Sequence, residues 1–407
     1  MLAVAAPLLA WSLAVAPAPA AVRKPAPAPA PQPAEGDALH LRLRDVRRRS
    51  EEVRPGTPEA KTLAAELSEI GAGYLEKRDL GRAIELLGEA YGWDPDNGIV
   101  LALLTLAYVR QEEFDFARFY LDLALQRAPR APPRAYEILG EVYYSWNRLE
   151  DAVVAWEHFR QLGGDNPVTL RRLLRARQEL ALSSGQRSLE GDGFSLFWDA
   201  SIGKDVAARI SDRLTDFYRE QSEFFGERLP ASQIVVLYAG RAYFSLVSVP
   251  DWVSGLFDGK IRVSLDPDGG LSPELEAVLA HELAHAFVRH VSGDHAPGWL
   301  HEGLALWWEG RRLMTSEIRE AFRGRSPHTL ADLNGNLARR ADRAAARTNY
   351  VEALGLVEYL VERYGSAAVA CFARDFGEGR TLTEALRLEF DLTPDELFRR
   401  WKEWARL

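Results

Sequence analysis

Between residues 64 and 167 the sequence repeats itself at a period of 34 or 35 residues, and this period restricts the possible folds more than any other feature. Each unit has a tyrosine, a small alanine and a large apolar residue at corresponding places, and two units close with a proline. The corresponding residues are Tyr74, Tyr108 and Tyr143, then Ala83, Ala117 and Ala152, then Leu87, Leu121 and Trp156, and finally Pro95 and Pro129. The alanine lets the second helix of a pair approach the first, the tyrosine fills the gap between them, and the proline ends the unit. The period therefore predicts stacked helix pairs.

This register resembles three tetratricopeptide repeats, which implies an all-α solenoid with a concave surface that often binds a peptide or a partner protein. The third unit departs from the pattern, because Gly163 and Gly164 stand where its proline is expected and Pro167 follows later. We expect residues 168–182 to form a helix that caps the stack. The alternative is that the array only supports the next domain as a rigid platform, and the sequence leaves both roles open.

The N-terminal region has the composition of an export signal followed by a linker. Residues 1–22 are apolar and end in Ala-Pro-Ala steps, which is typical of a secretory signal cleaved between Ala18 and Ala21. Because no basic residue precedes this stretch, an uncleaved membrane anchor is the alternative. We expect a periplasmic or extracellular protein in the first case and a membrane-anchored one in the second.

Residues 23–56 form the predicted linker and a basic segment. Residues 23–37 alternate proline and alanine, which excludes a helix or strand and predicts a semi-rigid, extended connection. Arg44 and the run Arg47 to Arg49 are interpreted as a solvated helix face without a partner. The solenoid is then expected at 57–185.

Charge and cysteine content exclude two classes of function. The formal net charge of −9 argues against nucleic-acid binding, which needs a clustered basic face. Cys371 is the single cysteine, so an intramolecular disulfide and a thiolate-rich zinc site are both impossible. Any metal must therefore be bound by imidazole and carboxylate groups.

A break around residues 183–193 separates the repeats from a second domain, which we place at 190–407. Short alternating apolar runs at 194–198, 233–238 and 260–265 predict strands, and residues 206–225 have helical spacing. Nearly everything after Ser272 has the pattern of helix. A small sheet followed by helices is an α+β arrangement.

The sequence His-Glu-Leu-Ala-His at 281–285 lies within a helix predicted from about Pro273 to Val291. Histidines four residues apart lie one above the other on one helix face, so His281 and His285 can both reach one metal ion. Glu282 lies beside them, where its carboxylate can take a proton from a water molecule at the metal. The motif thus supplies two ligands and a general base.

Seventeen positions after His285, Glu302 stands in Trp-Leu-His-Glu-Gly-Leu-Ala at the start of a second predicted helix. Together the two segments resemble the gluzincin-type zinc metallopeptidases, and the second is similar to the Trp-Leu-Asn-Glu-Gly string of the leukotriene-hydrolase-type aminopeptidases. The resemblance implies that Glu302 is the third ligand of one zinc ion. His301 replaces the asparagine of that string, so the role of that amide does not carry over.

The metzincin arrangement does not fit, because Val288 and Val291 occupy the positions where that scheme needs glycine and histidine. His290 lies about 140° around the helix from His285 and cannot join the same ion. We interpret His290 and His295 as surface or supporting histidines.

The developing oxyanion of an acyl-transfer reaction needs a donor besides the metal. The resemblance implies a tyrosine or histidine from a later helix. Our candidate is Tyr350, which we expect to open a helix, while a buried core tyrosine is the alternative. Tyr359, Tyr364 and His328 are further options. In the same clan an edge strand near residues 252–263 pairs with an extended substrate, and Gly255 and Gly259 would allow close approach or simply form turns.

These features predict a zinc-dependent peptidase with His281, His285 and Glu302 as ligands and Glu282 and Tyr350 as catalytic residues. The aminopeptidase Gly-Ala-Met-Glu-Asn string is absent, which favours an endopeptidase. The first alternative is a non-catalytic tetratricopeptide-repeat scaffold with an inactive metallopeptidase-like domain. The second is hydrolysis of a peptide-like amide in a cell-wall component.

Overall fold

The computed structural model of the chain describes residues 35–77, 79–111, 113–126, 132–183, 185–229, 232–241, 243–244, 254–266, 270–293, 295–324, 326–330, 332–333 and 343–407. The predicted export signal and most of the linker lie outside these residues, so both stay predictions. The chain divides into two compact units on either side of the Ala181–Leu182 bond. Among the described residues, no helix has the length and apolarity needed to cross a bilayer.

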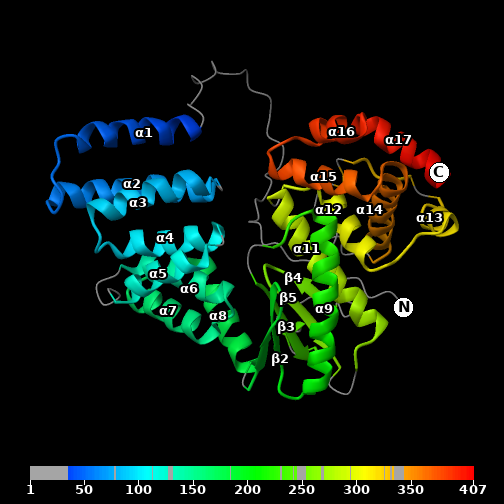
Figure 1. The fold of residues 1–407 in the computed structure, drawn as a ribbon, viewed down its shortest axis with the longest axis horizontal. Coiled ribbons are helices and arrows are strands. Elements are labelled where there is room, and N and C mark those ends of the chain that lie inside the picture. The colour runs from blue at the N-terminus through cyan, green and yellow to red at the C-terminus, as the bar shows by residue number, and fades with distance from the viewer. Residues whose placement is uncertain are drawn as a thin grey trace, which may run out of the picture. The chain divides into compact units, whose positions relative to one another are not determined.

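The N-terminal unit is a stack of helices, coloured blue to green in Figure 1. Its elements are α1 (Glu35–Ser50), α2 (Pro58–Glu76), α3 (Leu80–Trp93), α4 (Gly98–Gln111), α5 (Phe114–Gln126), α6 (Pro133–Ser145), α7 (Leu149–Gln161) and α8 (Pro167–Leu182). The pairs α2/α3, α4/α5 and α6/α7 are the three predicted repeats, and α8 is the helix expected after them. The all-α solenoid is therefore confirmed.

The alanines and the large apolar residues of the repeat are buried, as the period predicts, while Pro129 lies outside the described residues. Ala83, Ala117 and Ala152 are fully buried where the paired helices meet. In the third unit, Trp156 is fully buried and donates from Nε1 to the Glu137 carbonyl at 3.2 Å. Gly140 leaves the space for it, since a Cβ there would lie 2.2 Å from the indole nitrogen. The indole of Trp156 therefore requires glycine at position 140 on the facing helix.

The basic segment lies on a helix, α1, as predicted, but the linker prediction is wrong for residues 35–37, because α1 begins at Glu35. The helix occupies the proline-free interval between Pro33 and Pro55. Its Val46 is buried in the solenoid core. Its arginines remain exposed as predicted, but Arg49 pairs with Glu66, and Arg42 lies 2.7 Å from Glu69. The basic segment thus has partners within its own unit.

The C-terminal unit begins with a mixed sheet whose described strands have the order β1-β2-β3-β5-β4. The strands are β1 (Arg187–Glu190), β2 (Phe194–Trp198), β3 (Gln233–Ala239), β4 (Gly255–Phe257) and β5 (Ile261–Leu265). Strands β2, β3 and β5 pair in parallel, whereas β1 and β4 are antiparallel to their neighbours. In the described part of the chain, β4 therefore forms one edge of the sheet.

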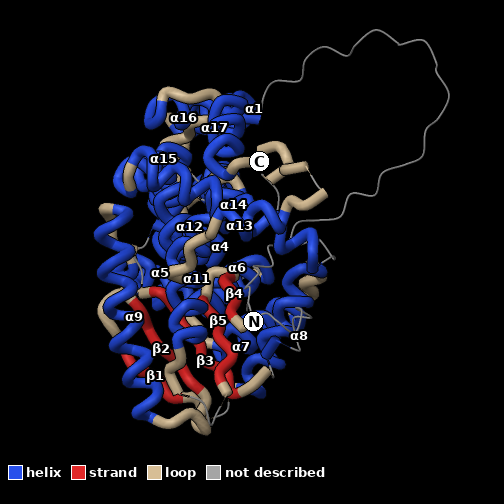
Figure 2. Tube along the Cα trace, turned by 90° about the vertical axis from the view of Figure 1, so that its right-hand side faces the viewer, coloured by secondary structure: helices blue, strands red, loops and turns tan. Residues whose placement is uncertain are grey.

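Alternating residues direct the two faces of the sheet to different cores. Val235 and Leu237 of β3 join the main core of this unit, whereas Val236 and Tyr238 join a smaller cluster on the opposite face. Helix α9 (Lys204–Phe225) lies along the sheet in Figures 1 and 2 and contributes to the main core.

The rest of the unit is mostly helical, which confirms the predicted α+β arrangement. These helices are α11 (Pro273–Ser292), α12 (Gly298–Trp308), α13 (Thr315–Ala321), α14 (Arg343–Tyr364), α15 (Ser366–Gly377), α16 (Leu382–Phe390) and α17 (Pro394–Ala405). Helix α11 contacts α9, α12, α15, β4 and β5. It is therefore the element around which the site described next is assembled.

Candidate metal centre

Helix α11 carries both histidines of the predicted site on a completely buried stretch. Ser272 begins the helix by accepting a hydrogen bond from the Leu275 amide at 3.2 Å, and Pro273 follows in the first turn, where proline is favourable. Gly293 ends it with a positive φ of 58°. His281 and His285 have no exposed surface, and their Nε2 atoms lie 3.0 Å apart.

Helix α12 follows after a short connection and brings Glu302 to the same place. Glu302 is 5% exposed, and its Oε2 lies 3.9 Å from His285 Nε2. One ligand atom from each of His281, His285 and Glu302 can be chosen so that all lie within 4.8 Å of one another. Two adjacent helices thus bring together the three residues that the sequence nominated.

The donor set fits a divalent cation. Oε2 of Glu302 and Oε1 of Glu282 are buried, and neither has a hydrogen-bond partner among the described residues. A buried carboxylate oxygen without a partner is costly unless it meets a cation. Two imidazoles and one carboxylate are also a donor set found at catalytic zinc. These residues could therefore hold a metal ion.

Burial and mutual charge strongly perturb the site. Burial, reinforced by Glu309 but opposed by His281, raises the pKa of Glu302 to about 7. Burial also raises the pKa of Glu282 to about 8. The charge of His281 lowers this pKa, whereas the charge of Glu302 raises it further. For His281, burial lowers the pKa, but Glu309 and the other two carboxylates outweigh it and raise the value to about 9. Burial and the neighbouring rings of His281 and His301 lower the pKa of His285 far below 6.5. In the protein alone, the cluster therefore retains protons that a divalent cation would displace.

A residue that the sequence analysis missed supports His281. The Glu309 carboxylate lies 2.7 Å from His281 Nδ1, on the side of the ring away from His285. Glu309 is the C-cap residue directly after α12 and lies seven residues after Glu302, so both are on the same side of the helix, two turns apart. That spacing is the sequence signal by which it could have been found.

His301, whose role the sequence left open, lies against the second histidine. Its Nδ1 is 2.7 Å from His285 Nδ1, and the two ring centres are 4.8 Å apart. The Nε2 atoms of the two motif histidines therefore face each other, while their Nδ1 atoms face His301 on α12 and Glu309 directly after it.

Strand β4 passes directly beside the motif. A Cβ on Gly255 would lie 2.6 Å from Glu282 Oε1 and 2.6 Å from Val278 Cγ1. Two residues later, the Phe257 ring is nearly parallel to the His285 ring at a centre distance of 6.4 Å. Close approach of the backbone to Glu282 is thus what requires glycine at 255, whereas Gly259 has a φ of 103° and serves a turn.

Tyr350 lies within α14 rather than at its start, which corrects the prediction, because the helix begins at Arg343. Its side chain is buried beside Leu306 of α12. Burial raises its pKa, and the charges of Glu302, Glu282 and Glu309 raise it further. Tyr350 is therefore close enough to sense all three carboxylates and keeps its phenolic proton.

Helices α12 and α14 meet backbone to backbone. A Cβ on Gly303 would lie 2.4 Å from the Ala353 carbonyl oxygen, so glycine is the residue that permits this approach. Gly303 follows Glu302 directly, and Ala353 is one turn after Tyr350. The contact thus sets the separation between the two residues.

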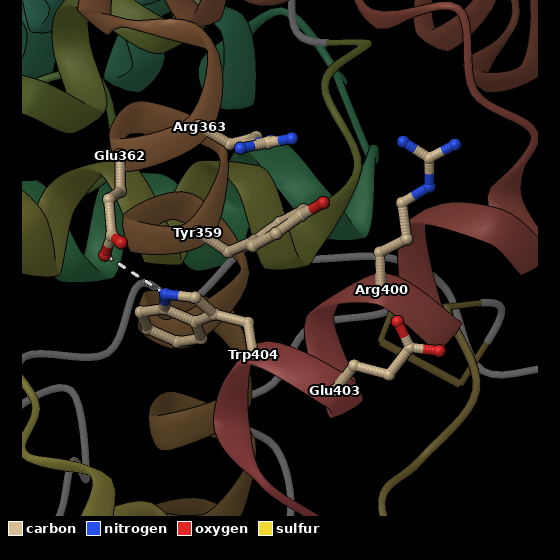
Figure 3. Close-up of a pocket in the computed structure, with 6 residues that line it drawn as sticks. All are labelled: Tyr359, Glu362, Arg363, Arg400, Glu403 and Trp404. Atoms are coloured by element: carbon tan, nitrogen blue, oxygen red, sulfur yellow. Dashed lines mark hydrogen bonds between the residues drawn. The ribbon is translucent and has the colours of Figure 1, made fainter.

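The other tyrosines proposed as donors point elsewhere. Tyr359 is nine residues after Tyr350, which places it on the opposite face of an α-helix. Tyr359 lines a pocket of about 450 Å³. Figure 3 shows it there with Arg400 and Trp404 of α17. Tyr364 packs on Phe390 of α16 at a ring distance of 4.9 Å.

The remaining histidines have partners or positions outside the three-residue group. His328 binds Glu352, with its Nδ1 2.6 Å from a carboxylate oxygen. His290 Nε2 lies 3.3 Å from Glu227, and burial lowers its pKa. His295 is exposed.

Comparison with known proteins gives a family for both parts. Residues 74–152 match the family model of the tetratricopeptide repeat, and residues 260–406 match that of the Peptidase MA superfamily. A comparison with curated proteins gave no match. The chain therefore combines tetratricopeptide repeats with a domain of the Peptidase MA superfamily.

Proposed function

We propose that this protein is a zinc-dependent peptidase that cleaves within extended polypeptides. The observation that carries the proposal is the convergence of His281, His285 and Glu302, buried and within 4.8 Å of one another, with Glu282 beside them. A structural zinc site is usually closed by four protein ligands, whereas three leave a position for water or substrate. An inactive domain of this kind usually lacks a ligand or the base. Here all four residues are present: His281, Glu282, His285 and Glu302.

A zinc ion in this site would polarise the scissile carbonyl and acidify a water molecule. Glu282 then acts as the general base, because its buried carboxylate faces the same region and carries an oxygen without a hydrogen-bond partner among the described residues. A nearby divalent cation favours the charged form of this carboxyl group and so counteracts its raised pKa. Glu282 takes the proton of the attacking water and passes it to the leaving amine.

Tyr350 supplies the second donor to the carbonyl oxygen as negative charge develops there. Its raised pKa keeps the hydroxyl protonated at neutral pH, as a hydrogen-bond donor must be. Its interaction with the carboxylates of Glu282 and Glu302 supports a place at the site rather than a purely structural role.

Strand β4 supports an extended peptide as substrate. It forms one edge of the described sheet and lies against Glu282 and His285 through Gly255 and Phe257. An edge strand offers backbone donors and acceptors to which an extended chain can add. Pairing of this kind needs no free substrate terminus, which favours internal cleavage.

The solenoid is proposed to bind a protein partner, and the whole protein to be exported. Phe116 and Phe119 on α5 are 54% and 53% exposed, and aromatic side chains are enriched in protein interfaces. The export proposal rests on residues 1–22 alone.

The test compares Glu282→Gln with the wild type in zinc content and in hydrolysis of unfolded casein. Glu274→Gln is the matched control, because Glu274 is exposed in the first turn of the same helix. We expect all three proteins to hold one zinc ion and only E282Q to lose hydrolysis, by about 10²- to 10⁴-fold. Equal hydrolysis by E282Q and wild type would refute the proposal. A wild type that binds zinc but cleaves no peptide would favour the non-catalytic scaffold.

A further inference from the structure

The contact between His285 and His301 constrains where two protons lie. The two Nδ1 atoms are 2.7 Å apart, which is hydrogen-bond distance. Two N–H groups at this separation would repel each other, and so would two lone pairs. One ring therefore donates and the other accepts.

The opposite side of His285 decides which ring donates. Its Nε2 lies 3.0 Å from His281 Nε2 and 3.9 Å from Glu302 Oε2, inside the three-residue group. If Nδ1 of a neutral His285 accepted from His301, the ring would carry its proton on Nε2, and that nitrogen could not bind a cation. If Nδ1 donates, Nε2 keeps its lone pair.

We propose that His301 is a positioning residue that accepts the Nδ1 proton of His285 and so holds Nε2 ready for the cation. His301 then carries its own proton on Nε2. This inference rests on the proposed metal site but not on the substrate. It assigns a role to the residue at which this chain departs from the family string.

The two histidines of the motif are then supported differently. His281 faces the carboxylate of Glu309 at 2.7 Å, and an ionised carboxylate can only accept. His301 is a neutral ring that accepts through one nitrogen only. The essential property at position 301 is therefore an acceptor atom, which asparagine also offers and leucine does not.

The experiment uses the full chain with His301→Leu and His301→Asn. Zinc affinity is measured by competition with a chromophoric chelator, and the cobalt-substituted proteins are compared by visible absorption. Loss of a partner that orients a metal-binding histidine weakens metal affinity by about 10- to 100-fold. We expect this loss and an altered cobalt spectrum in H301L, and near wild-type values in H301N. Equal weakening in both variants, or no change in either, would overturn the proposal.

A second measurement does not depend on the variants folding. Nitrogen-15 spectra of the histidine rings in the metal-free wild type should show His285 protonated on Nδ1 and His301 on Nε2. The reverse pattern would overturn the inference. Peptide hydrolysis is assayed separately, so a wild type with this pattern and no proteolysis would contradict only the proposed function.

Discussion

Replacing Gly255 with alanine should disable Glu282 without removing the metal. The added Cβ would lie 2.6 Å from both Glu282 Oε1 and Val278 Cγ1, and 2.9 Å from Glu282 Cγ. Val278 has little freedom to move, because its branched side chain is part of the main core. The Glu282 carboxylate is therefore the group that must shift.

The size of the shift follows from these distances. Ordinary contacts begin near 3.4 Å, so the oxygen must move by at least 3.4 − 2.6 = 0.8 Å, unless β4 itself moves. A misplacement of about 1 Å in a catalytic group can lower the rate about 10²-fold, or about 2.7 kcal/mol. Overpacking should also lower the free energy of unfolding by about 1 to 3 kcal/mol. The three atoms nearest to the added Cβ belong to Glu282 and Val278, and none of them to His281, His285 or Glu302.

The assay measures casein hydrolysis, zinc content and urea unfolding of Gly255→Ala beside Gly270→Ala. Gly270 is the matched control, because its added Cβ would meet, among the described residues, only Arg209, at an ordinary 3.8 Å. We expect G255A to keep zinc and lose about 99% of the rate, and G270A to match the wild type. Unchanged hydrolysis by a folded G255A would refute this placement of Glu282 and β4.

Three further outcomes follow from the structure. Tyr350→Phe should slow hydrolysis by about 10²- to 10³-fold with zinc retained, whereas Tyr359→Phe, on the opposite helix face, should not; equal rates for both variants would contradict the assignment. In metal-free protein, burial raises the pKa of Glu282 from 4.5 to about 8, so the folded state keeps a proton that the unfolded state has lost. The free energy of unfolding should therefore fall as pH rises through this window, and urea unfolding with chelator at pH 5 and pH 8 should show a smaller fall for E282Q. Gly140→Ala places a methyl carbon 2.2 Å from the Trp156 indole nitrogen and should destabilise the solenoid by about 1 to 3 kcal/mol. Gly88→Ala should not, because no atom of the described residues lies within 4 Å of its added Cβ, and thermal unfolding would show the difference.

The parts of the fold that were predictable depend on short-range patterns. The repeat period, the strands at 194–198, 233–238 and 260–265, and the α11 helix all appear in local spacing of apolar residues. Strand β1 was missed because its four residues are exposed and show no alternation. Strand β4 has only three residues, too few for a period to appear, and it was expected only from the family resemblance, near residues 252–263.

The site was predictable to the extent that its residues lie close in sequence. His281, Glu282, His285 and Glu302 lie on two consecutive helices. The spacing of the motif nominated the first three, and the resemblance of the second segment to the gluzincin string added Glu302. The pairing of His301 with His285 depends on how α12 packs against α11, which no local pattern encodes. The position of Tyr350 depends on α14, and the helix signal before it is weak enough that its true start at Arg343 was missed.

The backbone contact between Gly303 and Ala353 limits how the proposed site could change. Gly303 has no side chain to shorten, and a larger residue would meet the Ala353 carbonyl and the Val357 side chain, so the geometry between Glu302 and Tyr350 is inherited as a unit. New substrate preferences would then have to arise in β4 and the connecting segments, while this helix pair stays as it is. A selection experiment for altered cleavage should accordingly recover substitutions in β4 and the connecting segments, and none at position 303.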